Sequence, residues 1–216
     1  MTTVVVSPHL DDAVLSLGQF LDAHTDVTVV TVFAGVPAEG TISPYDQACG
    51  FTDSADAMRT RRSEDWAAVS GVLGADVMHL PFLDQQYRSE PAGWGAISET
   101  IGAQLPPDGC RVLVPLGIGH PDHEVAAMAG LAAVRPFVDD VFVYEELPYR
   151  VLNPEQVWRA FYGLWPQWQW ARFPHPFQQG RRAAKINALA QYQSQGPLWE
   201  DVCNLVPERT WHLARI

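Results

Sequence analysis

The sequence predicts an α/β fold: a three-layer sandwich in which a Rossmann-like, mostly parallel sheet carries helices on both faces. Two observations predict the class and the domain count. The class follows from short apolar runs rich in β-branched residues, which alternate with helix-like stretches along most of the chain. The domain count follows from size, because the 216 residues, 47% of them hydrophobic and 18% charged, can form one continuous core, whereas two full domains would be a tight fit. We therefore expect a single domain over residues 1–216.

The first three predicted elements form a βαβ unit. Thr3–Ser7 is a short β-branched run, Asp11–Ala23 suits a helix, and Val27–Ala34 is a second β-branched run. Two buried strands joined by a helix are parallel, because the helix returns the chain to the edge from which it started. This unit therefore predicts a parallel sheet from the start of the chain.

The alternation continues beyond this unit. Further strands are predicted at Val77–Leu80, Arg111–Leu116, Val141–Tyr144 and Thr210–Ile216, and further helices at Ala55–Leu73, Trp94–Leu105, His123–Val134 and Gln179–Tyr192. Two stretches break the rhythm. Gly35–Asp53 carries Gly, Pro, Ser and Asp with little periodicity, which predicts a loop. Arg150–Phe177 is crowded with aromatic residues, which either stack a cyclic substrate or, more commonly, fill a core, a subunit interface or a hydrophobic cover.

Composition narrows the choice of partners and compartment. The 14 basic and 25 acidic residues give a net charge of −11, which argues against a nucleic-acid partner and disfavours an anionic membrane. No apolar stretch approaches the roughly 20 residues needed to span a bilayer, and the chain starts with a strand-like run rather than a signal peptide. The 3 cysteines form no CxxC pair, so free thiols in a reducing compartment are expected. We expect a cytoplasmic protein, and a homo-oligomer would use the aromatic stretch as its contact.

The strongest local signal is the motif SPHLDD at residues 7–12, which lies where the first strand ends and the first helix begins. Ligands of open α/β sheets bind at the carboxyl ends of the strands, so chemistry is expected at this position. His9 and Asp12 can converge on one metal ion across the turn, which leaves Asp11 free for proton transfer. The alternative is that Asp11 and Asp12 only cap the helix by accepting hydrogen bonds from its free N–H groups.

A second motif changes the balance between these alternatives. GIGHPDH at residues 117–123 follows another predicted strand and again precedes a helix. Both motifs then lie at one edge of a parallel sheet, and two such clusters are hard to attribute to capping alone. His9, Asp12 and His123 would form an open site with three ligands, as in catalytic zinc centres. Asp122 would either orient a metal-ligating histidine or cap the following helix.

Together the two motifs resemble those of the LmbE-like or PIG-L superfamily of zinc-dependent N-deacetylases. Weaker similarities extend over most of the chain, at Arg62-Ser63-Glu64 with Leu73-Gly74-Ala75, at Leu80–Asp84, at Tyr144-Glu145, and at Lys185 with Tyr192-Gln193-Ser194-Gln195. The sequence departs from the family at Leu10, where Pro is common, and at Ala13, where Glu often completes the motif. Neither is a ligand or base position, so the departures concern the subfamily rather than the site.

The resemblance implies a set of site residues. The metal ligands would be His9, Asp12 and His123, with Asp11 as the general base and His120 as the second active-site histidine. His120 would stabilise an oxyanion or protonate the leaving amine, and the spacing does not decide whether Asp11 or His120 is the general acid. The expected cofactor is Zn²⁺, with Fe²⁺ or Mn²⁺ as alternatives on the same ligands.

Other polar residues have weaker signals. Arg62 and Asp84 are candidates for binding substrate hydroxyls or an anionic group, with a surface ion pair and a turn as the respective alternatives. Four histidines lie away from both motifs and are expected to be structural or exposed: His24, His79, His175 and His212.

The expected function is removal of an N-acyl group, above all N-acetyl, from an amino sugar or glycoconjugate by metal-activated water. The alternatives are metal-dependent hydrolysis of an ester or phosphoester, and a non-catalytic sugar-binding or regulatory protein that keeps the fold. A two-metal phosphoesterase would need additional bridging carboxylates, and a decayed enzyme would be expected to lack a ligand or the base. Amide hydrolysis is therefore favoured.

Overall fold

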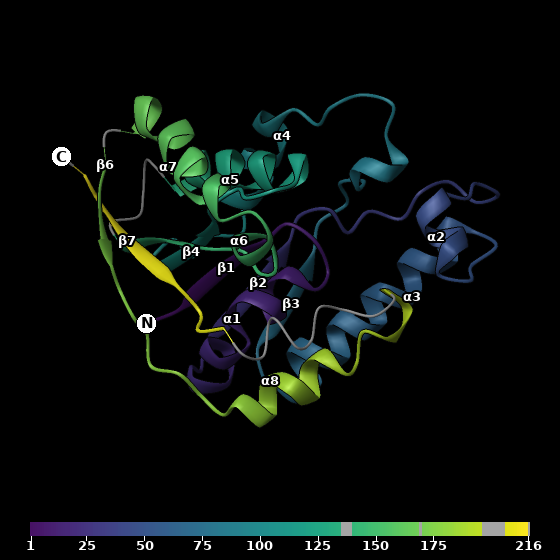
Figure 1. Ribbon diagram of the computed structural model, residues 1–216, viewed down its shortest axis with the longest axis horizontal. Helices are drawn as coiled ribbons and strands as arrows, with labels where there is room; N and C mark the ends of the chain where they lie inside the picture. Colours follow the sequence, from purple (N-terminus) through teal and green to yellow (C-terminus); the bar gives the residue numbers. More distant parts are fainter. Residues whose placement is uncertain (135–139, 169, 196–205, 216) are drawn as a thin grey trace.

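The structure, a computed structural model, describes residues 1–134, 140–168, 170–195 and 206–215 (Figure 1). One sheet has seven strands in the order β3-β2-β1-β4-β5-β7-β6. Its strands are β1 (Thr3–Ser7), β2 (Val27–Thr31), β3 (Asp76–His79), β4 (Arg111–Pro115), β5 (Asp140–Tyr144), β6 (Trp170–Pro174) and β7 (Thr210–Arg215). The predicted α/β class is confirmed.

The sheet is mostly parallel, as predicted. β1 pairs in parallel with both β2 and β4, β2 with β3, and β4 with β5. At one edge β7 runs antiparallel to β5, and β6 antiparallel to β7. Every residue of β1 is buried, because helices cover both faces of this central strand.

Two helical layers enclose the sheet (Figure 1). One contains α1 (Asp12–Ala23), α3 (Ser54–Trp66) and α8 (Arg182–Leu189), and the other contains α4 (Trp94–Gly102), α5 (Pro121–Val134) and α7 (Pro154–Trp168). Val4 and Val6 of β1 belong to the hydrophobic cluster under the second layer, and Val5 belongs to the cluster under the first. Side chains of a strand alternate between its faces, so β1 contributes to both cores.

The segment predicted as a loop, Gly35–Asp53, contains a short helix, α2 (Pro44–Ala48), so the prediction was wrong there. Ser43 caps this helix, its Oγ accepting a hydrogen bond from the N–H of Asp46 at 3.1 Å. Ser followed by Pro at the first helical position is a helix-start signal, which the lack of periodicity in this short segment concealed. The predicted helix Ala55–Leu73 is α3, continued by a π-helical segment, Ala67–Val72.

The aromatic stretch Arg150–Phe177 contains all of α7 and β6, and it begins inside a short helix, α6 (Tyr149–Leu152). Phe161 and Phe177 are buried in the two cores, whereas Tyr162 is exposed. Aromatic residues here therefore contribute in part to the core. Among the described residues, no helix is long and apolar enough to cross a membrane.

The strand order places both motifs together. β1 and β4 are neighbours at the centre of the sheet, with Val5 opposite Leu113. From β1 the sequence proceeds to β2 on one side, and from β4 it proceeds to β5 on the other. This reversal opens a crevice at the carboxyl ends of β1 and β4, the usual ligand position of such sheets.

Candidate active site

The first motif forms a tight turn that Ser7, rather than an aspartate, stabilises. Ser7 Oγ accepts a hydrogen bond from the N–H of Ala13 at 3.1 Å and donates one to the carbonyl of His9 at 2.8 Å. Asp11 precedes α1, but its side chain makes no capping hydrogen bond. The capping alternative therefore does not account for Asp11, because the serine at the strand end serves the first turn of the helix.

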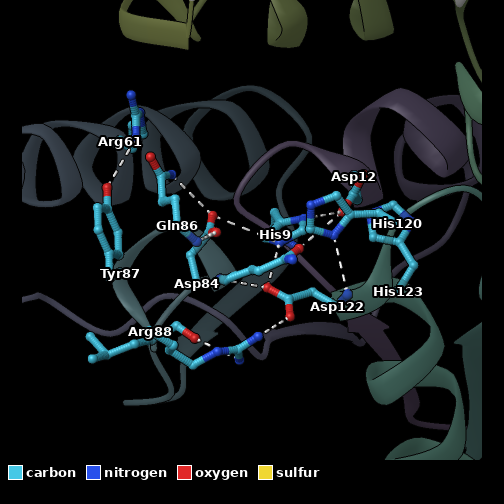
Figure 2. Close-up of polar contacts among 12 residues, drawn as sticks. His9, Asp12, Arg61, Asp84, Gln86, Tyr87, Arg88, His120, Asp122 and His123 are labelled. Atoms are coloured by element: carbon cyan, nitrogen blue, oxygen red, sulfur yellow. Dashed lines mark hydrogen bonds and ion pairs between the residues drawn. The ribbon is translucent and has the colours of Figure 1, made fainter. Parts of the chain in front are cut away.

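Three side chains meet around one carboxylate oxygen. Asp12 Oδ2 lies 3.2 Å from Nδ1 of His9 and 3.0 Å from Nε2 of His123 (Figure 2). Asp12 starts α1, His9 lies in the turn after β1, and His123 lies in the first turn of α5. The same oxygen accepts a hydrogen bond from the N–H of His9 at 3.0 Å, which fixes the carboxylate over the turn.

These atoms fit a divalent cation. His123 is completely buried, and neither ring nitrogen makes a hydrogen bond of good geometry, although Nε2 lies 3.0 Å from Asp12 Oδ2 and Nδ1 lies 3.4 Å from Glu146 Oε1. Buried polar atoms in that state call for an explanation. Tetrahedral ligands at bond lengths of about 2.0–2.1 Å lie roughly 3.3 Å apart, close to the spacing of these nitrogens from Asp12 Oδ2. Two imidazoles and one carboxylate are also a donor set that suits zinc.

Two other groupings, among the described residues, have all their potential ligand atoms within 4.8 Å of one another, a criterion that the set around Asp12 does not meet. They are His9, His120 and His123, and His9, Asp84 and Asp122. His120 Nδ1 already accepts a hydrogen bond from the N–H of Asp122 at 3.2 Å. Asp122 is likewise engaged, which makes both groupings less suitable than the set around Asp12.

Asp122 contacts His9 rather than the neighbouring His123. Its Oδ2 lies 3.3 Å from Nε2 of His9, and its other oxygen is ion-paired with the guanidinium of Arg88 (Figure 2). Burial opposes ionisation of Asp122, but its hydrogen bonds with His9, the N–H of Gln85 and Arg88 outweigh this and lower its pKa. Of the two roles expected for Asp122, the contacts favour orientation of a histidine over helix capping.

The side chain of Asp11 lies beside this centre. It lines the cavity described below, and burial, followed by repulsion from Asp12, raises its pKa to about 7. A carboxyl group that titrates near neutrality can accept and return a proton during a reaction. A cation bound beside Asp11 would lower this pKa and favour the carboxylate form.

His120 is held as a neutral ring. Since its Nδ1 accepts the N–H of Asp122, the proton of the neutral ring resides on Nε2. Burial, followed by the charges of His9 and His123, lowers the pKa of His120 to about 4. The preceding Gly119 has φ +76°, and a Cβ there would lie 2.5 Å from the Tyr149 ring, so only glycine fits this turn.

A cavity of about 560 Å³ opens beside these residues. Its lining includes His9, Leu10, Asp11, Asp12, Leu15, Phe33, Tyr45, Met58, Arg61, Asp84, Gln85, Gln86, His120, Pro148, Tyr149 and Gln195. Asp84 is thus among the lining residues, and its Oδ2 lies 3.8 Å from Nε2 of His9. The four outlying histidines and the described aromatic residues of 150–177 are not among the lining residues.

The structure does not bring Arg62 together with the other candidates. Arg62 lies outside the cavity lining and donates a hydrogen bond from Nε to Nδ1 of His79 at 3.3 Å. Its neighbour Arg61 lines the cavity, with Nη1 2.7 Å from Oδ1 of Asp46 and with Nε and Nη2 lacking partners. Arg61 follows the cavity residue Met58 by three positions on α3, a helical spacing that marks their shared face.

Comparison with known proteins assigns the chemistry. The PIG-L family profile, described as GlcNAc-PI de-N-acetylase, matches residues 4–134. The solved structure of teicoplanin deacetylase Orf2 in its zinc-inhibited form has a TM-score of 0.80 and 25% identity, covering 100% of this chain and 99% of that one. The A40926 pseudoaglycone deacetylase Dbv21 has a TM-score of 0.76 and 30% identity, covering 98% and 96% respectively.

A more distant structure shares the fold alone. N,N'-diacetylchitobiose deacetylase from Pyrococcus horikoshii has a TM-score of 0.59 at 14% identity, covering 98% of this chain and 82% of that one. A comparison with curated protein sequences found no match.

Both chemical motifs lie inside the region that the family profile matches. The matched region also carries β1, β4 and the start of α5, the elements that position the candidate ligands. The structural similarity extends this relationship over almost the whole chain. The chain therefore belongs to the PIG-L family, and it is a hydrolase that acts on an amide bond.

Proposed function

We propose that this protein removes an N-acetyl group from an amino sugar or glycoconjugate, using one divalent cation, Zn²⁺ in the first instance, held by His9, Asp12 and His123. The observation that carries the proposal is the convergence of both histidines on Asp12 Oδ2 beside an open cavity. The relatives support the substrate class, since they include deacetylases of teicoplanin and of A40926 pseudoaglycone. A zinc-inhibited form among them indicates that such proteins interact with this metal.

The residues around the metal position have different roles in amide hydrolysis. When bound, the cation lowers the pKa of water and polarises a carbonyl group. Asp11, next to the ligand Asp12, takes the proton from the attacking water. His120, neutral at pH 7 because its pKa is lowered to about 4, donates a hydrogen bond from Nε2 to the developing oxyanion. Asp11 then returns its proton to the leaving amine, so it serves as both base and acid.

The cavity suits a sugar. Its volume of about 560 Å³ falls within the range of roughly 300–1,000 Å³ of small-molecule sites. Asp84 offers carboxylate oxygens to a ligand, since its side chain lines the cavity and is 18% exposed. Arg61 forms part of the cavity wall, where its buried guanidinium pairs with Asp46 and lies over the ring of Tyr45. Hydroxyl groups of a sugar can donate hydrogen bonds to the Asp84 carboxylate.

Phosphoester hydrolysis by two metals is less well supported. A second cation would use His9, Asp84 and Asp122. The carboxylate of Asp122 is already ion-paired with the guanidinium of Arg88, and the positive charge of Arg88 opposes a second cation beside it. One cation and amide chemistry account for the same residues without that conflict.

The test is release of free amine from a panel of N-acetylated amino sugars and glycoconjugates by zinc-loaded protein. We expect amine release from at least one member, and release slowed by about 10²- to 10⁴-fold in the Asp11→Asn variant. Hydrolysis confined to ester or phosphoester analogues of the same sugars, with no amine released from any member, would contradict the proposal.

A further inference from the structure

Glu146 is a buried carboxylate that organises the loop of the second motif. It lies two residues beyond β5 and is completely buried. Its Oε1 accepts hydrogen bonds from the N–H groups of Gly117 at 2.7 Å and Ile118 at 3.1 Å. Its Oε2 accepts one from Leu116 at 3.2 Å. These bonds to consecutive amides, strengthened by the carboxylate's charge, fix the loop that leads from β4 to α5.

The same carboxylate faces His123 on the side opposite to the candidate metal position. Glu146 Oε1 lies 3.4 Å from Nδ1 of His123, whereas Nε2 of this ring lies beside Asp12. Both side chains are completely buried, so water cannot readily replace this contact. Glu146 therefore contacts the backbone at the start of the motif and the His123 ring at its end.

The arrangement repeats at the other histidine. His9 directs Nδ1 to Asp12 and Nε2 to the carboxylate of Asp122 at 3.3 Å. Each ring thus has one nitrogen at Asp12 and the other at a buried carboxylate that comes from a different element. Metal-ligating histidines commonly have such an outer carboxylate, which fixes the ring and its tautomer.

We propose that Glu146 is a positioning residue of the metal centre: it keeps the proton of His123 on Nδ1, so that the lone pair of Nε2 is presented to the cation. A histidine coordinates through an unprotonated nitrogen, and a carboxylate beside the other nitrogen stabilises the tautomer that coordination requires. Its bonds to residues 116–118 hold the loop at a fixed distance from this ring. The inference rests on the proposed metal-dependent function.

The adjacent Glu145 provides a matched control. It is also buried, at 2% exposure, but it accepts a hydrogen bond from Nε1 of Trp211 at 2.9 Å and pairs with Arg150 at 3.3 Å. Its polar contacts are with Arg150, Arg209 and Trp211 rather than with the candidate ligands, because consecutive residues at a strand end point in different directions. The same substitution at both positions therefore separates loss of a buried carboxylate from loss of this particular contact.

The experiment compares Glu146→Gln and Glu145→Gln in the full chain by competition for Zn²⁺ against a chromophoric chelator. Glutamine keeps an acceptor oxygen for the loop amides but removes the charge that faces His123. We expect E146Q to lose about 10- to 100-fold in zinc affinity, the usual effect of removing an outer partner of a ligand. E145Q should keep the affinity of the wild type, and the visible spectrum of the Co²⁺-substituted protein should change for E146Q alone.

Wild-type zinc affinity and an unchanged Co²⁺ spectrum in folded E146Q would overturn the inference. If E146Q does not fold, as judged by circular dichroism, Glu146→Asp replaces it, since this variant keeps the charge but draws it away from the ring. E146D should also bind zinc more weakly, and unchanged affinity would again overturn the inference. If the wild-type protein binds no zinc and releases no amine, this result would instead contradict the proposed function itself.

Discussion

Two buried clusters of charged residues in this protein differ in how their polar atoms are paired. Under α1, Lys185 Nζ lies 3.0 Å from Oε1 of Glu208, and both side chains are 1% exposed. Glu208 also accepts the N–H groups of Gln19 at 2.8 Å and Phe20 at 3.0 Å. These amides are available because α1 is locally non-helical at Leu17. The cluster satisfies its polar atoms internally, as expected of a structural ion pair.

The cluster of His9, Asp12 and His123 is different. Its carboxylate and ring nitrogens approach to 3.0–3.2 Å, yet neither nitrogen of the buried His123 makes a hydrogen bond of good geometry. Leaving a buried polar atom unpaired costs about 1–3 kcal/mol, and a cation bound to Nε2 would offset this cost for that nitrogen. Burial and charge alone therefore do not distinguish a binding site from a structural ion pair, whereas buried polar atoms that converge without good hydrogen bonds point to a ligand.

The largest expected effect is at the metal centre. His123→Ala should abolish stoichiometric zinc binding and lower amine release by at least about 10³-fold, because water without a metal is a much weaker nucleophile. Metal analysis and the amine assay check this on protein shown by circular dichroism to be folded. A variant that keeps one zinc per chain would show that His123 is not a ligand.

Replacing Asp11 should separate chemistry from metal binding. Asp11→Asn should retain zinc and lower kcat by about 10²- to 10⁴-fold, the usual contribution of a general acid or base. Zinc content and steady-state rates are measured on the same preparation. Zinc loss as complete as that of the His123 variant would make Asp11 a ligand and contradict its role as the base.

The structural cluster should show the opposite behaviour. Lys185→Met leaves Glu208 buried without its cation, so the free energy of unfolding should fall by about 3–5 kcal/mol. The zinc affinity of the folded fraction should not change. Denaturant unfolding measures the first quantity and chelator competition the second.

The matched control for this variant is Arg181→Met. Arg181 pairs with Asp22 on the surface, where its side chain is 79% exposed, and such solvent-screened pairs contribute little to stability. Equal destabilisation by the two substitutions would contradict the structural role assigned to the buried pair.

The smallest expected effect concerns substrate binding. Arg61→Lys keeps a positive charge near Asp46 but removes the planar guanidinium that lies 5.1 Å from the ring centroid of the cavity residue Tyr45, so KM should rise by about 10-fold, as for loss of one buried cation–π contact at the cavity wall. Arg62→Lys, outside the cavity lining, should leave KM unchanged. Steady-state kinetics on an accepted substrate measure both, and the reverse order would return the role to Arg62.

Much of the fold could be predicted because its signals are local. β1, β4 and β5 lie within a residue or so of the expected bounds, since strands covered on both faces consist of consecutive apolar residues. The meeting of the two motifs followed from topology, because carboxyl ends of adjacent parallel strands share an edge. The roles of individual ligands stay predictions until metal binding is measured.

What could not be predicted depends on side-chain direction across distant elements. Arg61 and Arg62 are adjacent, and only the packing of α3 decides which of them faces the cavity. Asp122 contacts His9, which lies in the turn after β1, rather than His123, its neighbour in α5. The packing of α5 turns the Asp122 side chain toward that turn. Glu146 lies outside both motifs, so nothing in their spacing indicates it.

The most direct test of the central claim is a zinc titration of metal-free protein, followed by the rate of amine release. We expect no release without metal, a rise that ends at one equivalent of zinc per chain, and no response in the His123→Ala variant. Amine release by metal-free protein at the rate of the reconstituted protein would contradict it, because His9, Asp12 and His123 would then have no catalytic metal to hold.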